Sequence, residues 1–277
     1  WLRRRATVKT YPLMKAEKVR DLCFSKNDGM LDILTDTRHL QFDIETENIQ
    51  CRYQLQKDTR YILSPHHHGT YTVRFDRDFG NHIVSLNQTP LFITKHYPYN
   101  VASSKDTISI ALSSQEIVVG TLESGHHHCT FQKINIGDVA LTSVTVQNKV
   151  FSGMLNGELS VYDTETDLMS IHVFNETESE SSDGRIIRCI DVEWISNDSF
   201  WVYMGRQDGV VKGYRFDFFA NRPPEVSACC TRKLHRSPVT GIRFCAGRVA
   251  TCDENGRVVV TDMYGAKIIY DFFFGKE

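Results

Sequence analysis

Two runs of three histidines are the residues of this chain best suited to metal chemistry, because neutral imidazole is a common zinc ligand. The runs lie at 66–68 and 126–128. Adjacent residues of a strand point to opposite faces, so at most two histidines of a run share a side. Apart from Cys129 beside the second run, neither run has cysteines or carboxylates nearby at ligand spacing. We therefore predict no bound metal and no cofactor.

Motifs for covalent catalysis and for phosphate binding are absent from the sequence. There is no Gly-x-Ser-x-Gly elbow, no HExxH metalloprotease motif and no Gly-x-x-x-x-Gly-Lys-Ser/Thr loop. Carboxylates that converge in the fold could still form an acid–base site with raised pKa values. We predict a protein that is not an enzyme and keep an enzyme of this acidic type as an alternative.

Charge, hydropathy and cysteine usage exclude several classes of protein. The 32 Lys and Arg residues nearly balance the 34 Asp and Glu residues, which argues against direct nucleic-acid binding. No stretch approaches 18 apolar residues, so we expect no membrane partner. The eight cysteines include no CxxC pair, and most lie in apolar runs, where a free cysteine acts as a small buried hydrophobe. This usage predicts a cytoplasmic or nuclear protein.

One acidic segment and one basic segment are interpreted as solvated. Residues 175–184 include no apolar side chain and cannot offset their ordering entropy by burial, which predicts a mobile surface loop. Phosphorylation at Thr177 is the alternative interpretation of that loop. Arg4 and Arg5 precede Thr7 in a basophilic-kinase pattern, but we interpret this stretch as a solvated approach to the first strand.

The elements that carry these residues are short strands separated by polar turns, and helical periodicity is almost absent. Asn156-Gly157, Asp208-Gly209 and Asn255-Gly256 each precede a strand pattern. Because Asn-Gly tolerates positive φ angles, we predict two-residue hairpin turns at these dipeptides.

A longer unit repeats around such turns. An aromatic residue or Thr lies six residues after the acidic or amide residue of each turn, at positions 42, 162, 214 and 261, with softer matches at 94 and 130. The average interval of about 44 residues suits a four-stranded blade.

These segments resemble the WD-repeat family, most closely from Val150 to Asp163 and from Val249 to Asp262. His235 and His68 are similar to the family's structural His, each 26 residues before its Thr. No repeat has Trp at the Trp-Asp position, so the hydrogen-bond set that the family builds from His, Ser/Thr, Asp and Trp is expected to be incomplete in most repeats.

The resemblance implies an all-β β-propeller of four-stranded antiparallel blades over residues 19–277, after an N-terminal lead-in, or closing strand, at 1–18. Six blades are visible, and seven are the alternative. Strand alternation alone does not distinguish a propeller from a β-sandwich or from a pair of β domains.

The first twelve residues, from Trp1 through Arg3-Arg4-Arg5 to Tyr11-Pro12, are similar to the junction after the F-box in F-box/WD-repeat proteins. The chain begins at Trp1 rather than Met. That resemblance implies an upstream helical segment that would bind the adaptor of a cullin-type ligase.

A rigid propeller lowers the ordering cost of binding, so we predict a protein-interaction platform with protein partners. The first hypothesis is the substrate-recognition or adaptor module of a ubiquitin ligase complex. The second is a scaffold subunit of a trafficking, cytoskeletal or RNA-processing assembly. WD-repeat proteins commonly bind partners at the face of their d–a loops and b–c turns. By that resemblance, and because Arg and Tyr are favoured anchors, the candidate partner-binding residues are Arg20, Arg38, Tyr71, His126, Arg188 and Arg206.

Overall fold

The computed structural model describes the backbone of residues 8–11, 19–24, 30–43, 46, 48–55, 59–64, 69–86, 89–104, 107–122, 129–174, 182–220 and 222–274. These residues form 25 strands and one 3₁₀ turn, η1 (Ser182–Arg185). None of the helices in the described part of the chain has the length and hydrophobicity needed to span a membrane. The chain divides into two compact units, one of Trp1–Arg52 with Asp191–Glu277 and one of Tyr53–Ile190.

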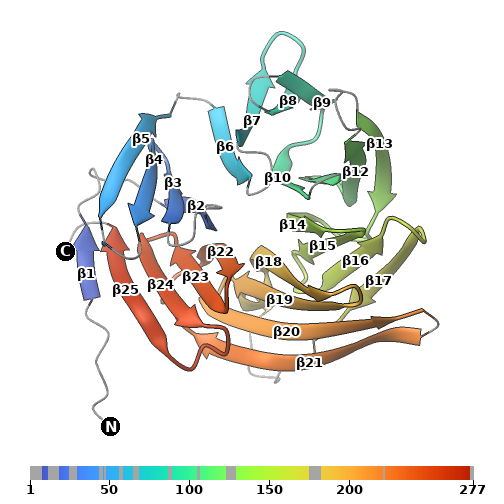
Figure 1. The fold of residues 1–277 in the computed structure, drawn as a ribbon. Helices are drawn as coiled ribbons and strands as arrows, with labels where there is room; N and C mark the ends of the chain where they lie inside the picture. The colour runs from blue at the N-terminus through green and yellow to red at the C-terminus, as the bar shows by residue number, and fades with distance from the viewer. Residues whose placement is uncertain are drawn as a thin grey trace. The chain divides into compact units, whose positions relative to one another are not determined.

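Six sheets account for the strands, and each contains four strands that follow one another in the chain (Figure 1). The three sheets of the unit Tyr53–Ile190 are β6 (Thr59–Ser64), β7 (Gly69–Asp76), β8 (Asn81–Leu86) and β9 (Thr89–Thr94); β10 (Pro98–Ser103), β11 (Thr107–Leu112), β12 (Glu116–Leu122) and β13 (Cys129–Asn135); and β14 (Ala140–Val146), β15 (Lys149–Met154), β16 (Leu159–Asp163) and β17 (Leu168–His172).

The other unit holds the last sheet and nearly all of the first sheet and of the sheet before the last. Their strands are β2 (Val19–Phe24), β3 (Met30–Thr35), β4 (Arg38–Asp43) and β5 (Ile49–Gln54); β18 (Ile187–Ser196), β19 (Ser199–Arg206), β20 (Val210–Phe219) and β21 (Arg222–Lys233); and β22 (Val239–Cys245), β23 (Arg248–Asp253), β24 (Arg257–Asp262) and β25 (Ile268–Phe274). Separate four-stranded sheets of this kind exclude the β-sandwich alternative, in which two sheets stack face to face.

Burial differs between the inner strands and the last strand of a sheet. Every residue of β11 and of β15 is buried, whereas β17 is mostly exposed. Within each unit the first strands of neighbouring sheets contact one another, β10 with β6 and β14, and β2 with β22. The sequence of a strand that is packed on both faces is a continuous run of apolar and small residues, without alternation of apolar and polar ones.

The Asn-Gly and Asp-Gly turns are present, but they are longer than the two residues that we predicted. Gly157, Gly209 and Gly256 have φ angles of 87°, 82° and 88°, and each donates its N–H to the carbonyl three residues before it. Met154 N–H also bonds the Glu158 carbonyl at 3.0 Å, which closes a three-residue loop. A type I turn followed by a left-handed glycine is the usual form of such loops, so only the glycine needs positive φ.

The repeat positions 94 and 130 were placed on the wrong strand. Positions 42, 162, 214 and 261 lie on β4, β16, β20 and β24, the third strand of each sheet. Thr94 and Thr130 lie on β9 and β13, the fourth strand of theirs. The correction has a local cause: neither Thr follows an Asn-Gly or Asp-Gly pair, so a common β residue was matched without the turn signal that fixes the register of β16, β20 and β24.

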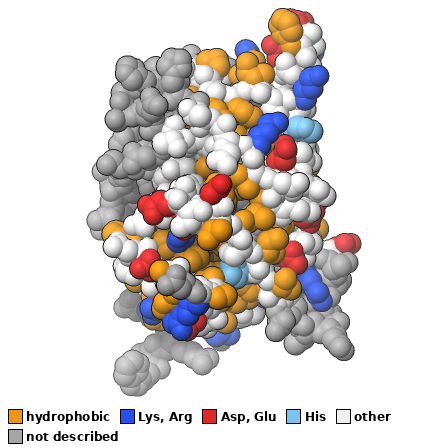
Figure 2. Space-filling view, turned by 90° about the vertical axis from the view of Figure 1, so that its right-hand side faces the viewer, with side chains coloured by type: hydrophobic (Ala, Val, Ile, Leu, Met, Phe, Trp, Pro, Cys, Tyr) orange, Lys and Arg blue, Asp and Glu red, His pale blue; other side chains and the backbone are white. Residues whose placement is uncertain are grey.

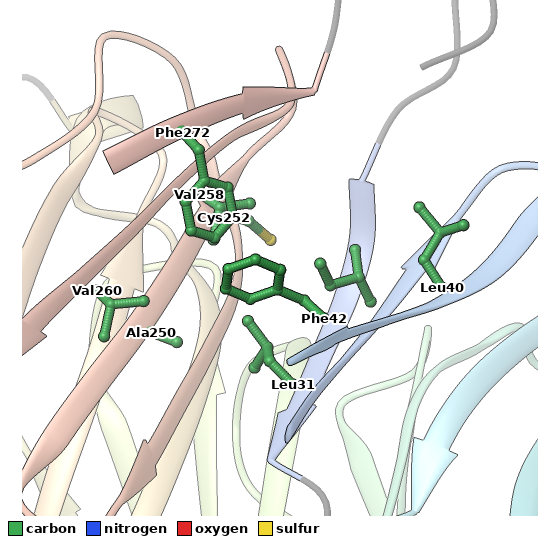
Figure 3. Close-up of a cluster of buried hydrophobic side chains, with 9 residues drawn as sticks. Leu31, Leu40, Phe42, Ala250, Cys252, Val258, Val260 and Phe272 are labelled. Atoms are coloured by element: carbon green, nitrogen blue, oxygen red, sulfur yellow. The ribbon is translucent and has the colours of Figure 1, made fainter. Parts of the chain in front are cut away.

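One core of the unit that contains both chain ends joins the first sheet to the last. Leu31, Ile33, Leu40 and Phe42 pack with side chains of β23, β24 and β25. Figure 3 shows the Phe42 ring directed at that of Phe272, and the ring centroids are 5.0 Å apart. This cluster fixes two sheets that are far apart in sequence.

A fifth strand extends the last sheet. β1 (Val8–Tyr11) pairs in parallel with β25, from Val8 beside Asp271 to Tyr11 beside Phe274. The segment before the first sheet therefore covers the free edge of the last one.

Candidate interaction surface

Two of the six candidate contact residues have side chains at least partly open to solvent. Arg38 is the first residue of β4 and is half-buried, and its N–H donates to the Thr35 hydroxyl oxygen at 2.8 Å. It therefore lies directly after the short turn between the second and third strands of its sheet, as expected. Arg188 is the second residue of β18 and is exposed.

Tyr71 and Arg206 are buried. Tyr71 belongs to an apolar cluster of the unit Tyr53–Ile190. The Arg206 guanidinium lies 3.0 Å from the Asp208 carboxylate, and Asp208 also accepts the N–H of Val210, so this ion pair supports the turn after β19. Arg20 lies in β2, but its side chain, like all of His126, is outside the described residues. A contact role for the six residues stays a prediction.

His235, Thr251 and Asp253 make the most connected buried polar group of the last sheet. The His235 Nε2 atom lies 2.8 Å from the Thr251 hydroxyl, and Nδ1 lies 3.2 Å from Asp253 Oδ2. Because a carboxylate only accepts hydrogen bonds, Nδ1 carries a proton. His68, the other residue that we matched to the family's structural His, is outside the described residues.

The same three residue types at these distances can also form a catalytic triad. Here the exposed fractions are 1% for His235, 0% for Thr251 and 3% for Asp253, so the hydroxyl is closed to a substrate in this conformation. Asp253 Oδ1 instead accepts the N–H groups of Asn255 and Arg257, which form the turn between β23 and β24. The arrangement therefore stabilises a turn.

The lowered pKa of Asp253 agrees with a structural role for His235, Thr251 and Asp253. Burial alone would raise the pKa of Asp253, but hydrogen bonds from His235 and from the Arg257 N–H lower it below its usual value. The Arg257 guanidinium pairs with both Asp271 oxygens, at 3.0 and 2.7 Å. It also donates to the Leu234 carbonyl. These bonds hold the loop before β22 against β24 and β25.

Metal ligands do not gather in the part of the chain that the structure describes, where no group of three His, Cys, Asp or Glu residues could hold an ion. Both histidine runs fall outside that part. The prediction that they bind no metal therefore stays a prediction.

The sheet of β18–β21 carries exposed apolar side chains that sequence reasoning did not find. Its strands have 10, 8, 10 and 12 residues, and no described strand of the other sheets exceeds eight. The extra length lies beside the two hairpin turns, where the Phe218 N–H donates to the Asp198 carbonyl at 2.7 Å. We name as the hairpin patch the exposed side chains at this end: Trp194, Ile195, Phe219 and Val226.

The hairpin patch combines aromatic and aliphatic groups, and charged side chains lie beside it. The Arg222 guanidinium lies 3.7 Å from the centre of the Phe219 ring. On the opposite side of the turn, Arg215 pairs with Asp217 at 3.0 Å, and Asp217 accepts the Ser199 hydroxyl. More widely, on the face drawn in Figure 2, exposed hydrophobic side chains lie among scattered charged ones.

A sequence signal for the hairpin patch existed. The interval between positions 162 and 214 is 52 residues, against the average of about 44, and part of this added length lies in longer strands. The run Phe216-Asp217-Phe218-Phe219 followed by Arg222-Pro223-Pro224 has aromatic residues at every second position and then a turn. Alternation up to Phe218 followed by turn residues predicts a strand that ends in a hairpin.

The comparisons with known proteins establish the fold and not the family. No family model and no curated protein sequence matches the chain. The β-propeller domain of Cps50 (Swd1) from Myceliophteria thermophila is 11% identical, with a TM-score of 0.63 over 99% of this chain and 90% of that one. KlHsv2 with loop 6CD replaced by a Gly-Ser linker is 10% identical, with a TM-score of 0.54 over 94% and 83%.

The computationally designed Ika8 protein is 16% identical, with a TM-score of 0.52 over 96% of this chain and 89% of that one. At such identities the likeness concerns the fold alone. Together with the six four-stranded sheets, it confirms the predicted fold class, an all-β six-bladed β-propeller.

Proposed function

We propose that this chain is a non-catalytic protein-interaction platform. The observation that carries the proposal is the hairpin patch, in which Trp194, Phe219 and their neighbours are exposed at the end of an extended sheet. Trp, Tyr and Arg dominate the energetic centres of protein interfaces, and the exposed Trp194 and the Arg222 guanidinium beside Phe219 are groups of these types. Propeller domains commonly serve as scaffolds of this kind.

The hairpin patch is also held firmly enough to bind without large ordering costs. Phe216, which lies opposite Val226 in the pairing of β20 with β21, and Phe200 are fully buried, and Phe218 packs against both rings. Because these contacts fix the hairpin before a partner arrives, little backbone entropy is lost on binding.

The finer role that we propose is the substrate-recognition or adaptor module of a ubiquitin ligase, in the cytoplasm or nucleus. Two features support it: the similarity of residues 1–12 to an F-box junction, and the WD-repeat resemblance. The hydrogen bonds of His235 with Thr251 and Asp253 are of the type on which that resemblance rests. A fixed scaffold subunit of another assembly is the second candidate, favoured by the apolar character of the hairpin patch, which suits a permanent interface.

Proximity labelling of the full-length protein in cells tests both levels of this proposal. The double variant Trp194→Ser/Phe219→Ser should lose a discrete set of labelled proteins at unchanged melting temperature. Tyr264→Ser, which changes an exposed aromatic outside the patch, should keep them. A cullin adaptor in the labelled set supports the ligase role, and a fixed set without one supports the scaffold. Identical labelling by wild type and double variant would refute the platform.

A further inference from the structure

A row of aromatic rings joins the sheet β6–β9 to the first strand of the next sheet, within the unit Tyr53–Ile190. The ring centroids are 4.9 Å apart for Phe75 and His82, 5.3 Å for His82 and Tyr97, and 5.3 Å for Tyr97 and Tyr99. The exposed fraction is 51% for Phe75 and 40% for Tyr97, so the row reaches the surface. We name these four residues the ring cluster.

Strand register brings the ring cluster and Arg60 to one face and one end of the sheet. Phe75, near the end of β7, lies opposite His82, near the start of β8. Arg60, the second residue of β6, lies opposite Val73, which is two residues before Phe75 and therefore on the same face. Tyr97 lies in the connection between β9 and β10. Residues from three strands and one loop thus meet at this end.

The Arg60 guanidinium is held beside the ring cluster with one edge unused. Its Nη1 atom donates to the Pro98 carbonyl at 3.1 Å and to the Tyr97 hydroxyl oxygen at 3.4 Å. Its Cζ atom lies 5.9 Å from the centre of the Tyr97 ring. Both hydrogen bonds use Nη1, so the Nε and Nη2 edge of this exposed side chain has no partner among the described residues. Such an edge matches a carboxylate, which accepts two parallel N–H bonds.

Charge at the ring cluster favours an anionic partner. Burial lowers the pKa of His82, so this ring is neutral at pH 7 and Arg60 supplies the charge. Asp76 follows Phe75 in β7 and therefore points to the opposite face of the sheet, where its Oδ1 atom accepts the N–H of Asp78 at 3.0 Å. In the part of the chain that the structure describes, no carboxylate pairs with Arg60. Its charge is available to a partner.

The loop that carries Tyr97 is fixed before anything binds to it. The Tyr97 N–H donates to the Ser113 hydroxyl oxygen at 3.0 Å, and the Ser113 N–H donates to the Tyr97 carbonyl at 2.8 Å. The His96 N–H also donates to the Thr94 hydroxyl oxygen at 3.1 Å. A surface whose backbone is already held in this way loses little entropy on binding.

We propose that the ring cluster and Arg60 bind a short acidic segment of a protein partner. An Asp or Glu carboxylate of the segment pairs with the unused edge of the Arg60 guanidinium. A neighbouring apolar side chain of the segment packs on the exposed rings of Phe75 and Tyr97. This proposal rests on the platform function and adds a second surface to it, in the other unit of the chain from the hairpin patch.

A single-stranded nucleic acid fits the ring cluster less well than an acidic peptide. Successive bases stack on open ring faces, whereas the interplanar angle is 90° for His82 and Tyr97 and 73° for Tyr97 and Tyr99. These rings therefore meet edge to face and do not form a row of parallel platforms. The whole chain also carries a net charge of −2, which gives no general attraction for a phosphate backbone.

Peptide phage display on the full chain tests the proposal, with linear peptides of about twelve residues, enough for one extended segment. The selected peptides should include a class with Asp or Glu next to an aromatic residue or leucine. Fluorescence anisotropy should show that the affinity of this class falls about tenfold for Arg60→Gln, which corresponds to about 1.4 kcal/mol. Phe75→Ser should lower the affinity by a similar factor.

The matched controls lie on the opposite face of the same sheet. Arg74 follows Val73, which lies opposite Arg60, so Arg74→Gln removes the same charge from the other face. Ile93 is 59% exposed and shares that other face, because it lies opposite Ile83, which lies opposite Arg74. Arg74→Gln and Ile93→Ser should each change the affinity less than about twofold.

Three results would overturn the proposal: no selected peptide distinguishes Arg60→Gln from Arg74→Gln, the peptides that do so lack acidic residues, or an oligothymidylate of about twelve nucleotides binds the wild type and loses affinity in Arg60→Gln. If Arg60→Gln lowers the melting temperature, the comparison of Phe75→Ser with Ile93→Ser decides by the same criterion. Loss of labelled partners in the hairpin-patch variant is unaffected by these results, so the two proposals fail separately.

Discussion

Replacing His235 by alanine should destabilise the protein substantially, because both ring nitrogens bond buried partners. Asp253 Oδ2 loses its 3.2 Å partner, which leaves a buried carboxylate oxygen desolvated at a cost of about 1–3 kcal/mol. Thr251 loses a 2.8 Å bond but can still donate to the Val259 carbonyl. The loss of this bond should therefore cost about 1 kcal/mol of unfolding free energy. We expect a total loss near 3 kcal/mol, within the range for broken buried pairs.

Urea unfolding followed by tryptophan fluorescence measures this loss, because Trp194 and Trp201 lie in the same unit as His235. Thr251→Val should cost about 1 kcal/mol alone and less in the His235→Ala background, which gives a coupling energy in a double-mutant cycle. His96→Ala, at an exposed position, is the control and should stay within about 0.5 kcal/mol of wild type.

The pH dependence adds a second check on the same group. The pKa of Asp253 is lowered in the folded state, so its contribution is present above about pH 4 and is lost as the pH falls further. Asp253→Asn should remove that part of the acid sensitivity. A His235→Ala protein as stable as the wild type at pH 7 would refute the structural interpretation of this group.

Three other substitutions have defined outcomes. Phe42→Ala should cost about 3–5 kcal/mol of unfolding free energy in urea, because it opens a cavity beside Phe272 in the fully buried cluster. Gly209→Ala should cost more than about 1 kcal/mol, since φ is 82° and the new Cβ would lie 2.3 Å from the His235 carbonyl oxygen; a thermal melt detects this. Burial, followed by a neighbouring carboxylate, raises the pKa of Glu193 to about 7, so calorimetry should find stability lost as the pH rises from about 4.5 to 7, and Glu193→Gln should flatten that slope.

Local sequence pattern was sufficient to predict most strands and the positions, but not the lengths, of the Asn-Gly and Asp-Gly turns. Alternating residues and an Asn-Gly or Asp-Gly turn place β16, β20 and β24 correctly, because both signals are set by neighbours in the chain. Thr94 and Thr130, which follow no Asn-Gly or Asp-Gly pair, were assigned to the wrong strand of their sheets. His235 was also found, since its partners lie on the adjoining hairpin.

The surfaces were not predictable in the same way. Tyr71 and Arg206 were chosen as contact residues by analogy of position, but burial depends on how sheets pack, which pattern does not encode. The hairpin patch was missed because strand extension and loop insertion give the same interval between repeats. The covered edge of β25 depends on a partner strand more than 250 residues away in sequence, which local pattern does not encode.

Cross-linking mass spectrometry on the full-length protein isolated with its native partners tests the central claim most directly. Carboxylate-directed cross-links should join partner proteins to Asp198, Asp217 and Glu225, which flank the hairpin patch, and Trp194→Ser/Phe219→Ser should abolish them. Partner cross-links confined to other sheets, or equal cross-linking by that variant, would contradict the account.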